Sequence, residues 1–168
     1  MTVITGHTHR RWASPLGELT IVIDAQEKLL GIYYPNHRPT PNQDFGRPDA
    51  TACQRVVDQL AEYFAGHRSR FELPLASQGT QFQQEVWAAI AAIDYGHTSS
   101  YGEVARQLGR PEASRAVANA TSRNPWSIVV PCHRLIGADG SLTGYAGGIA
   151  AKRFLLELEA ATALANNG

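Results

Sequence analysis

The sequence contains little cysteine and no long apolar run. Only two of its 168 residues are cysteines, Cys53 and Cys132, which is too few for a disulfide framework and gives no C-x-x-C pair. No stretch of about 18 apolar residues occurs, as a transmembrane helix would need, and the first eleven residues lack the apolar segment of a secretory signal. These absences favour a reducing, cytoplasmic setting and no membrane partner.

Net charge is also lacking, because 15 Lys and Arg balance 15 Asp and Glu. The charges are nevertheless unevenly spread. Residues 1–96 contain eight basic and ten acidic residues, residues 97–153 contain seven and three, and residues 154–168 contain none and two. The basic block would suit binding to a polyanion such as DNA. Its four surplus charges are equally compatible with an ordinary solvated surface.

Residues 10–77 predict a small antiparallel sheet with one helix. Apolar residues alternate on either side of turn residues, which indicates a hairpin with one buried face. Pro74 restricts its own segment to an edge strand. The small polar residues Ser77-Gln78-Gly79 favour a domain boundary there. The expected elements are a turn at 14–17, strands at 18–24 and 29–34, a loop at 35–48, a helix at 52–65 and an edge strand at 71–75.

From Thr80 onward the apolar spacing becomes helical. Gly109 and Pro111 separate two short predicted helices in the pattern of a helix-turn-helix. A plain pair of antiparallel helices packed in a core is the alternative. A series of arginines predicted to be exposed favours DNA: Arg106, Arg110, Arg115 and Arg123. The expected helices are 81–93, one capped by Ser99 or Ser100 and running to 108, then 112–122 and 150–165.

Two further segments complete the predicted C-terminal half. Residues 136–142, with a turn at 138–140, predict a hairpin that would form a wing beside the helix pair. Residues 144–148 are glycine-rich but lack the context of a phosphate-binding loop, so no nucleotide site is expected. The predicted fold class is α/β (α+β), with an N-terminal sheet-and-helix domain at 1–77 and a winged helix-turn-helix domain at 78–168 that carries the active site.

Residues 128–134, with the sequence IVVPCHR, contain the chemistry expected of this chain. Three β-prone residues predict a buried strand that ends at Pro131, which places the Cys132 thiol on a stiff turn. His133 and a distant carboxylate could turn that thiol into a nucleophilic thiolate. A buried structural cysteine is the alternative, since this is the usual state of a free cysteine.

These residues also carry a resemblance to a known family. Asn124-Pro125, Pro131-Cys132-His133-Arg134 and residues 144–148 (GYAGG) resemble the signature of the O6-alkylguanine-DNA alkyltransferases, also called methylated-DNA–protein-cysteine methyltransferases. The similarity extends to residues 101–105, 115–117 and 155–159. It covers the C-terminal half closely. The N-terminal half resembles the family's ribonuclease-H-like domain more weakly.

The resemblance implies a suicidal, single-turnover DNA repair enzyme. It implies that Glu159 orients His133, that His133 takes the proton from Cys132 through a water molecule, and that Asn124 ties together the backbone around the site. An alkyl group on guanine O6 would then move irreversibly to Cys132, with O4-alkylthymine as a poorer substrate. From the residues alone, Glu159 would be expected to be a solvated carboxylate on a helix.

The resemblance also implies base flipping, because a paired and stacked base is out of reach of the thiol. Arg115 would enter the base stack, and Tyr101 would help to rotate the nucleotide and would donate toward the guanine. Helix-turn-helix proteins usually dock in the major groove. The resemblance implies that this protein would instead bind DNA in the minor groove.

A substrate pocket follows from the same resemblance. Backbone groups near Cys132 and Leu135 would take the exocyclic amine of guanine, and Tyr145, Ala146 and Gly147 would form a wall. The sequence departs from the family at three places. Ala146 replaces a serine of some members, Ala118 replaces a common glycine, and Trp126-Ser127 lies where members vary and is expected to change the pocket size.

No cofactor and no metal are expected, because the N-terminal half lacks the spacing of a structural zinc site. The expected partner is double-stranded DNA containing O6-alkylguanine. The protein is expected to be a monomer in solution, with cooperative assembly on DNA left open. Three rival functions are a binding module of the same fold without the cysteine, a winged-helix transcription factor with a redox-sensing Cys132, and a cysteine hydrolase.

Overall fold

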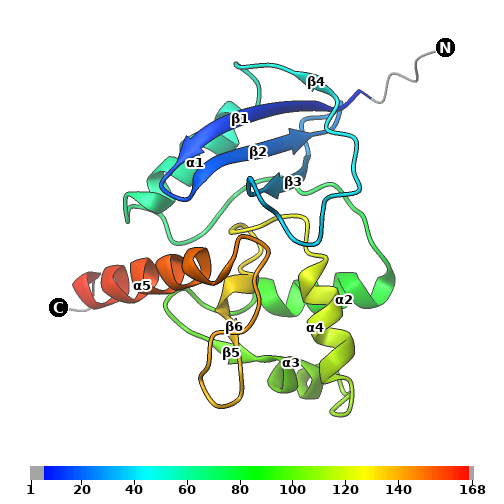
Figure 1. The fold of residues 1–168 in the computed structure, drawn as a ribbon, viewed down its shortest axis with the longest axis vertical. Helices are drawn as coiled ribbons and strands as arrows, with labels where there is room; N and C mark the ends of the chain where they lie inside the picture. The colour runs from blue at the N-terminus through cyan, green and yellow to red at the C-terminus, as the bar shows by residue number, and fades with distance from the viewer. Residues whose placement is uncertain (1–5, 167–168) are drawn as a thin grey trace.

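The N-terminal half of the computed structural model is a four-stranded sheet with one helix packed against it (Figure 1). The structure describes residues 6–166. The sheet has the order β3-β2-β1-β4, with antiparallel pairing except between β1 and β4. The elements are β1 (Thr8–Ser14), β2 (Gly17–Ile23), β3 (Leu29–Tyr33), β4 (Arg47–Pro48) and α1 (Gln54–Phe64). The predicted hairpin and helix are confirmed, and β4 is a short addition within the predicted loop.

Helix α1 covers the sheet because its apolar residues fall on one side. Val56, Val57, Leu60 and Tyr63 are buried on this helix, and they join a core that includes the inward-facing residues of β2. The helix ends before Gly66, whose φ of 78° is a left-handed conformation that glycine adopts without strain. Tyr63 lies in the last turn of α1. Its hydroxyl reaches the C-terminal half, where it takes part in the site described below.

The C-terminal half contains the helix pair predicted from the sequence. Thr80 closes a capping box at the start of its first helix, and the Ser100 side chain accepts from the Glu103 N–H at the start of α3. Helices α3 and α4 form the helix-turn-helix, so the predicted fold class is confirmed. The elements are α2 (Gln81–Ala91), β5 (Ser99–Ser100), α3 (Tyr101–Gln107), α4 (Ser114–Ser122), β6 (Leu135–Ile136) and α5 (Ile149–Asn166).

The strand predicted immediately before Cys132 is wrong. The backbone there forms successive tight turns, with N–H to C=O bonds from Val130 to Trp126 (2.9 Å) and from Cys132 to Val130 (2.8 Å). Ile128 has a φ of 74°, which a regular strand cannot accommodate. Cys132 instead begins a short 3₁₀ helix, Cys132–Arg134. The β-branched residues reflect burial of this segment, which sequence alone does not distinguish from a strand.

Three other predicted elements differ from the structure. The wing hairpin at 136–142 is wrong in its pairing, because β6 pairs with β5 in parallel and is followed by a turn in which the Gly137 N–H donates to the Ser141 carbonyl. The edge strand at 71–75 is reduced to one bridge between Leu75 and Leu29. The helix predicted from 112 begins at Ser114, after a turn.

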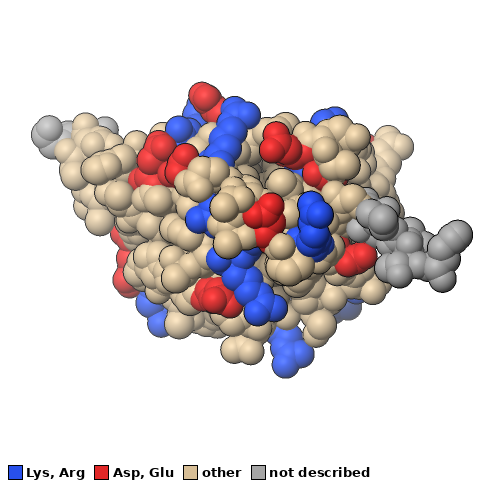
Figure 2. Space-filling model, turned by 90° about the horizontal axis from the view of Figure 1, so that it is seen from above, with Lys and Arg blue, Asp and Glu red and all other residues tan. Residues whose placement is uncertain are grey.

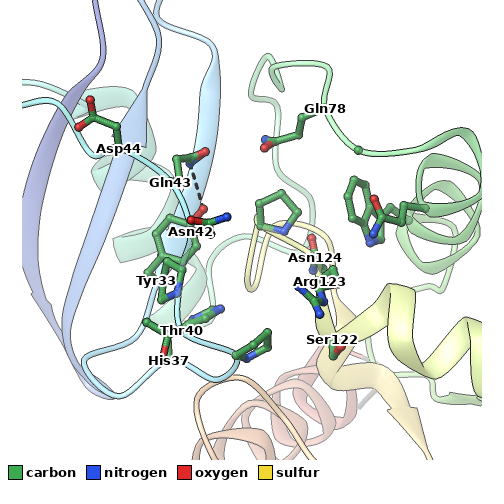
Figure 3. Close-up of a pocket in the computed structure, with 16 residues that line it drawn as sticks. Tyr33, His37, Thr40, Asn42, Gln43, Asp44, Gln78, Ser122, Arg123 and Asn124 are labelled. Carbon is green, nitrogen blue, oxygen red and sulfur yellow. Dashed lines mark hydrogen bonds between the residues drawn. The ribbon is translucent and has the colours of Figure 1, made fainter. Parts of the chain in front are cut away.

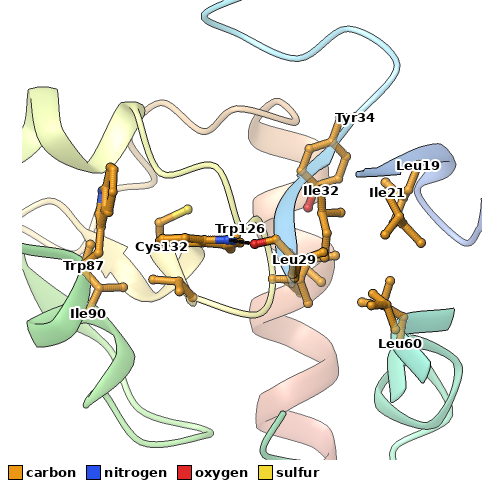
Figure 4. Packing of buried hydrophobic residues seen from close by; sticks show 14 of the residues in the cluster. Leu19, Ile21, Leu29, Ile32, Tyr34, Leu60, Trp87, Ile90, Trp126 and Cys132 are labelled. Carbon is orange, nitrogen blue, oxygen red and sulfur yellow. Dashed lines mark hydrogen bonds between the residues drawn. The ribbon is translucent and has the colours of Figure 1, made fainter. Parts of the chain in front are cut away.

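One hydrophobic core runs through both halves of the chain (Figure 4). The Trp126 indole N–H donates to the Leu29 carbonyl at 2.7 Å, and the Ile32 N–H donates to the Pro125 carbonyl at 2.8 Å. Trp126 also packs edge-on against Trp87, with ring centroids 5.4 Å apart. The segment that leads to Cys132 is thus anchored to the N-terminal sheet.

The charges of the basic block do not all reach the surface. Arg134 and Lys152 are buried, at 6% and 0% exposed, which leaves five exposed basic residues against three acidic ones in residues 97–153. The predicted arginine series is exposed on and around α3 and α4: Arg106, Arg110, Arg115 and Arg123. On the opposite side, over the N-terminal sheet, basic and acidic side chains are interspersed (Figure 2). The helix pair is therefore the part of the surface best suited to a polyanion.

No helix among residues 6–166 is both long enough and apolar enough to cross a membrane.

Candidate active site

Cys132 lines a cavity of about 570 Å³ between the helix pair and the glycine-rich segment. Cys132 is otherwise buried, with only 6% of the residue exposed. The size is within the range of roughly 300–1,000 Å³ typical of small-molecule sites. The cavity is lined by residues of both halves of the chain: Arg38, Pro39, Tyr101, Ala118, Thr121, Ser122, Asn124, Cys132, Thr143, Gly144, Tyr145 and Ala146.

His133 and Glu159 form a buried pair behind the cysteine. The His133 Nε2 atom lies 2.6 Å from Glu159 Oε2, and both side chains are at most 1% exposed. Burial lowers the pKa of His133 despite the adjacent carboxylate, so the imidazole is neutral near pH 7. A neutral imidazole that donates from Nε2 to a carboxylate has an unprotonated Nδ1. That Nδ1 is buried and has no hydrogen-bond partner among residues 6–166, so it is free to act as a base.

Glu159 also binds two groups that sequence analysis did not place in the site. Arg134 donates to it from Nε at 2.7 Å and from Nη2 at 3.1 Å, and the Tyr63 hydroxyl donates at 2.5 Å. Burial would raise the pKa of Glu159, but the bonds from His133 and Arg134 outweigh it and lower the pKa to about 2. The carboxylate on α5 is therefore ionised, and it is held by residues from α1 and the 3₁₀ helix.

The environment of the Cys132 thiol favours its neutral form until a base acts on it. Burial raises the pKa of Cys132, and this rise is opposed by the Asn124 side chain and by the positive charge of Lys152. Lys152 is fully buried on α5 and donates to the Leu135 carbonyl and to Thr143 Oγ1, the latter at 3.2 Å. Burial lowers the pKa of Lys152 to about 8. Sequence reasoning counted it as a surface charge.

Asn124 holds the turns before the cysteine. Its amide nitrogen donates to the Val130 carbonyl at 2.9 Å, and its amide oxygen accepts from the Trp126 N–H at 3.0 Å. The side chain is 3% exposed and directly follows the end of α4. It thus links α4 to the segment that positions Cys132.

Tyr101 and Tyr145 both place aromatic rings in the cavity lining. The Tyr101 hydroxyl lies 2.7 Å from Thr143 Oγ1, and burial raises its pKa, so that it remains a donor. The Tyr145 hydroxyl lies 2.7 Å from the hydroxyl of Tyr34. Ala146 lines the cavity beside Tyr145, whereas Gly147 lies against the Tyr34 ring.

Four predicted pocket residues do not line the cavity, and one of them is Gly147. Trp126 packs toward Leu29, and Ser127 is fully buried with a hydroxyl that has no partner in the described part of the chain. Leu135 is also fully buried, and its carbonyl accepts from Lys152. Any effect of these residues on pocket size must therefore be transmitted through the segments they anchor.

Arg115 is exposed at the second position of α4 and is not part of the cavity lining. This position lets it reach a ligand outside the protein. The described residues contain no group of three or more His, Cys, Asp or Glu side chains that could hold a metal ion.

A second cavity of about 480 Å³ lies on the other side of Asn124 (Figure 3). It is bounded by the loop after β3 and by the ends of α2 and α4, and it shares Pro39, Ser122 and Asn124 with the first cavity. Within it the Gln43 amide donates to the Tyr33 hydroxyl at 3.0 Å. It is lined by no cysteine, so of these two cavities only the first offers a thiol.

Because Glu159 is ionised in the folded protein, we expect the free energy of unfolding to decrease as the pH becomes acidic. Its folded pKa of about 2 lies below the unfolded value of about 4.3, so its contribution is complete above about pH 4.3 and is lost as pH falls toward 2. We expect Glu159→Gln to lower the free energy of unfolding by roughly 3 kcal/mol at pH 7 and by much less at pH 3. Urea unfolding at several pH values measures this difference. Glu157→Gln, an exposed change on the same helix, should leave the curve unaltered. Parallel curves for Glu159→Gln and the unchanged protein would contradict the expectation.

The fold and the site together define a protein with a helix-turn-helix and a buried cysteine that lines a cavity in front of a histidine–glutamate pair. Residues 81–161 match the family described as 6-O-methylguanine DNA methyltransferase, DNA binding domain. Residues 9–77 match its ribonuclease-like domain. The chain belongs to the methylated-DNA–protein-cysteine methyltransferases, a family of DNA repair enzymes.

Individual relatives are similar over nearly the whole chain. The methylated-DNA–protein-cysteine methyltransferase of Mycobacterium bovis is 47% identical over 94% of this chain and 95% of its own length. The protein of the same name from Methanosarcina acetivorans is 55% identical over 87% and 94%. Mycobacterium tuberculosis OGT, whose crystal structure is a complex with DNA, has a TM-score of 0.85 and 46% identity over 92% and 94%. The predicted family is thus confirmed.

Proposed function

We propose that this protein flips O6-alkylguanine out of duplex DNA and transfers the alkyl group to its own Cys132, irreversibly and once per molecule. The observation that carries the proposal is the position of Cys132, which faces a cavity of about 570 Å³ with the His133–Glu159 pair behind it. O4-alkylthymine is a poorer substrate. Double-stranded DNA is the partner, as it is in the complex of the Mycobacterium tuberculosis relative.

The first step is removal of the proton from Cys132. His133 is neutral and has an unprotonated Nδ1, which takes the thiol proton through a water molecule. Glu159 is ionised and stabilises the imidazolium that forms. Lys152 favours the thiolate because its positive charge lowers the pKa of Cys132. A buried thiol with a raised pKa is thus converted into a nucleophile only while it reacts.

In the second step the thiolate sulfur forms a bond to the alkyl carbon as the bond from that carbon to guanine O6 breaks. The electron pair of the broken bond goes to guanine, which takes up a proton from solvent while the His133 imidazolium releases the proton that it took from Cys132. Tyr101 lines the cavity as a protonated phenol and donates toward the developing charge. The product is a thioether, which is stable, so each protein molecule reacts once.

Recognition of DNA uses the helix pair. The exposed arginines of α3 and α4 bind phosphates, and Arg115 enters the base stack from α4 while the damaged nucleotide occupies the cavity. The helix enters the minor groove. Because the extruded base is read inside the protein, guanine in any sequence context is accepted.

The test is the mass of the intact protein after mixing with a duplex that contains one O6-methylguanine. A methyl-sized increase that maps to Cys132, with one guanine restored for each protein molecule, is expected. Turnover beyond one equivalent, or methylated DNA that persists beside protein of unchanged mass, would refute the proposal.

A further inference from the structure

The segment that forms one wall of the Cys132 cavity is held from behind by the N-terminal half. Tyr145 and Ala146 contribute this wall. The Tyr34 hydroxyl lies 2.7 Å from the Tyr145 hydroxyl, and the Arg38 N–H donates to the Ala146 carbonyl at 3.0 Å. Both contacts come from the chain directly after β3, more than 100 residues away in sequence.

Tyr34 is buried and packs closely against the segment that forms the wall. Its side chain is 5% exposed, and its ring meets the Tyr145 ring edge-on, with centroids 5.5 Å apart and an angle of 70°. A Cβ atom at Gly147 would lie only 2.7 Å from a Tyr34 ring carbon, so only glycine permits this approach. Tyr34 itself lies outside the cavity lining.

Tyr145 is therefore in contact with both the reaction space and Tyr34. Its ring shares the cavity with Cys132, and the Tyr145 and His133 rings are 6.3 Å apart. Any substituent on the carbon attacked by Cys132 must fit in the space that Tyr145 bounds. The position of the Tyr145 ring is fixed on its far side by the hydroxyl of Tyr34.

We infer that Tyr34 is a positioning residue that sets the largest alkyl group accepted, because its hydroxyl holds Tyr145 against the space beside Cys132. The inference rests on the proposed function, since it concerns the alkyl group that Cys132 receives. Tyr34 thereby affects which alkyl group is accepted without itself lining the cavity.

The test compares two duplexes of one sequence that contain O6-methylguanine or O6-benzylguanine, with the full-length protein in excess. The readout is the ratio of the benzyl to the methyl transfer rate. Tyr34→Phe keeps the ring and removes the hydroxyl, so we expect the ratio to rise about fivefold, the change that corresponds to about 1 kcal/mol for one neutral hydrogen bond. Tyr145→Phe removes the other half of the same bond and should raise the ratio equally. The ratio of the double variant should be no higher than that of either single variant.

Tyr33→Phe is the matched control, because it removes a neighbouring hydroxyl that bonds to Gln43 and lies outside the Cys132 cavity (Figure 3). Its ratio should equal that of the unchanged protein. An unchanged or lower ratio in Tyr34→Phe, or additive effects in the double variant, would overturn the inference. If Tyr34→Phe does not fold, the ratio of Tyr145→Phe decides alone. Failure of the unchanged protein to transfer either group would instead refute the proposed function.

Discussion

Replacement of Cys132 by serine is expected to abolish methyl transfer and to leave DNA binding intact. A serine hydroxyl is far less ionised and less nucleophilic than a thiol, and neutral His133 is too weak a base to compensate. The arginines proposed to bind DNA are exposed on and around α3 and α4, so the change does not reach them. Intact-protein mass measures transfer, and fluorescence anisotropy with a labelled duplex measures binding.

Cys53→Ser is the matched control. Cys53 is the other cysteine, it is buried, and its thiol lies 3.7 Å from the Ile21 carbonyl in the N-terminal half. Burial raises its pKa to about 11, and it does not line the Cys132 cavity, so we do not expect it to compete as a nucleophile. This variant should transfer at the rate of the unchanged protein. A methyl group found on Cys53, or transfer retained by Cys132→Ser, would remove Cys132 from its assigned role.

Replacement of Arg115 by alanine should separate base flipping from chemistry. Extrusion of a paired base costs a few kcal/mol, so loss of the residue that holds the vacated position should slow duplex repair by at least about a hundredfold. Free O6-benzylguanine needs no extrusion and should react at nearly the unchanged rate. Both rates can be measured as the appearance of alkylated protein under single-turnover conditions.

Arg106→Ala removes an equally exposed charge from α3 and is the control. It should weaken DNA binding in a salt-dependent manner, and saturating DNA should restore its rate. If saturating DNA also restores the rate of Arg115→Ala, then Arg115 supplies only charge. Equal loss with duplex and free base would show that it supports the fold.

The Cys132–His133–Glu159 arrangement could be predicted from the sequence, whereas most of the groups that support it could not. Cys132 and His133 are adjacent, and the resemblance added Glu159. Tyr63 had no signal, because its bond to Glu159 joins residues 96 positions apart. Arg134 lies within the recognised motif, but a sequence cannot show whether an arginine points outward or into a buried ion pair.

Helices that are determined by local chemistry were predicted from the sequence. Segments whose structure depends on long-range contacts were not. The caps at Thr80 and Ser100 are local, and the helices they begin were predicted within a few residues. The turns before Cys132 depend on the Asn124 side chain and on the anchoring of Trp126 to β3. These contacts are not visible in the sequence, so the apolar β-branched residues of this segment wrongly predicted a strand. Lys152 was misplaced for a similar reason, since its burial depends on the segment around Thr143.

The contacts between the two halves also bear on how the chain unfolds. Trp126 bonds to Leu29, Tyr63 bonds to Glu159, and one core is shared by both halves. Separation of the halves would leave a buried carboxylate with one partner fewer and would expose the shared apolar core to water. The N-terminal sheet and the helix-turn-helix should therefore lose their structure in a single cooperative transition. Damage that destabilises either half would then remove the nucleophile and the DNA-binding surface together, so a partly unfolded molecule would not remain bound to DNA without the means to repair it.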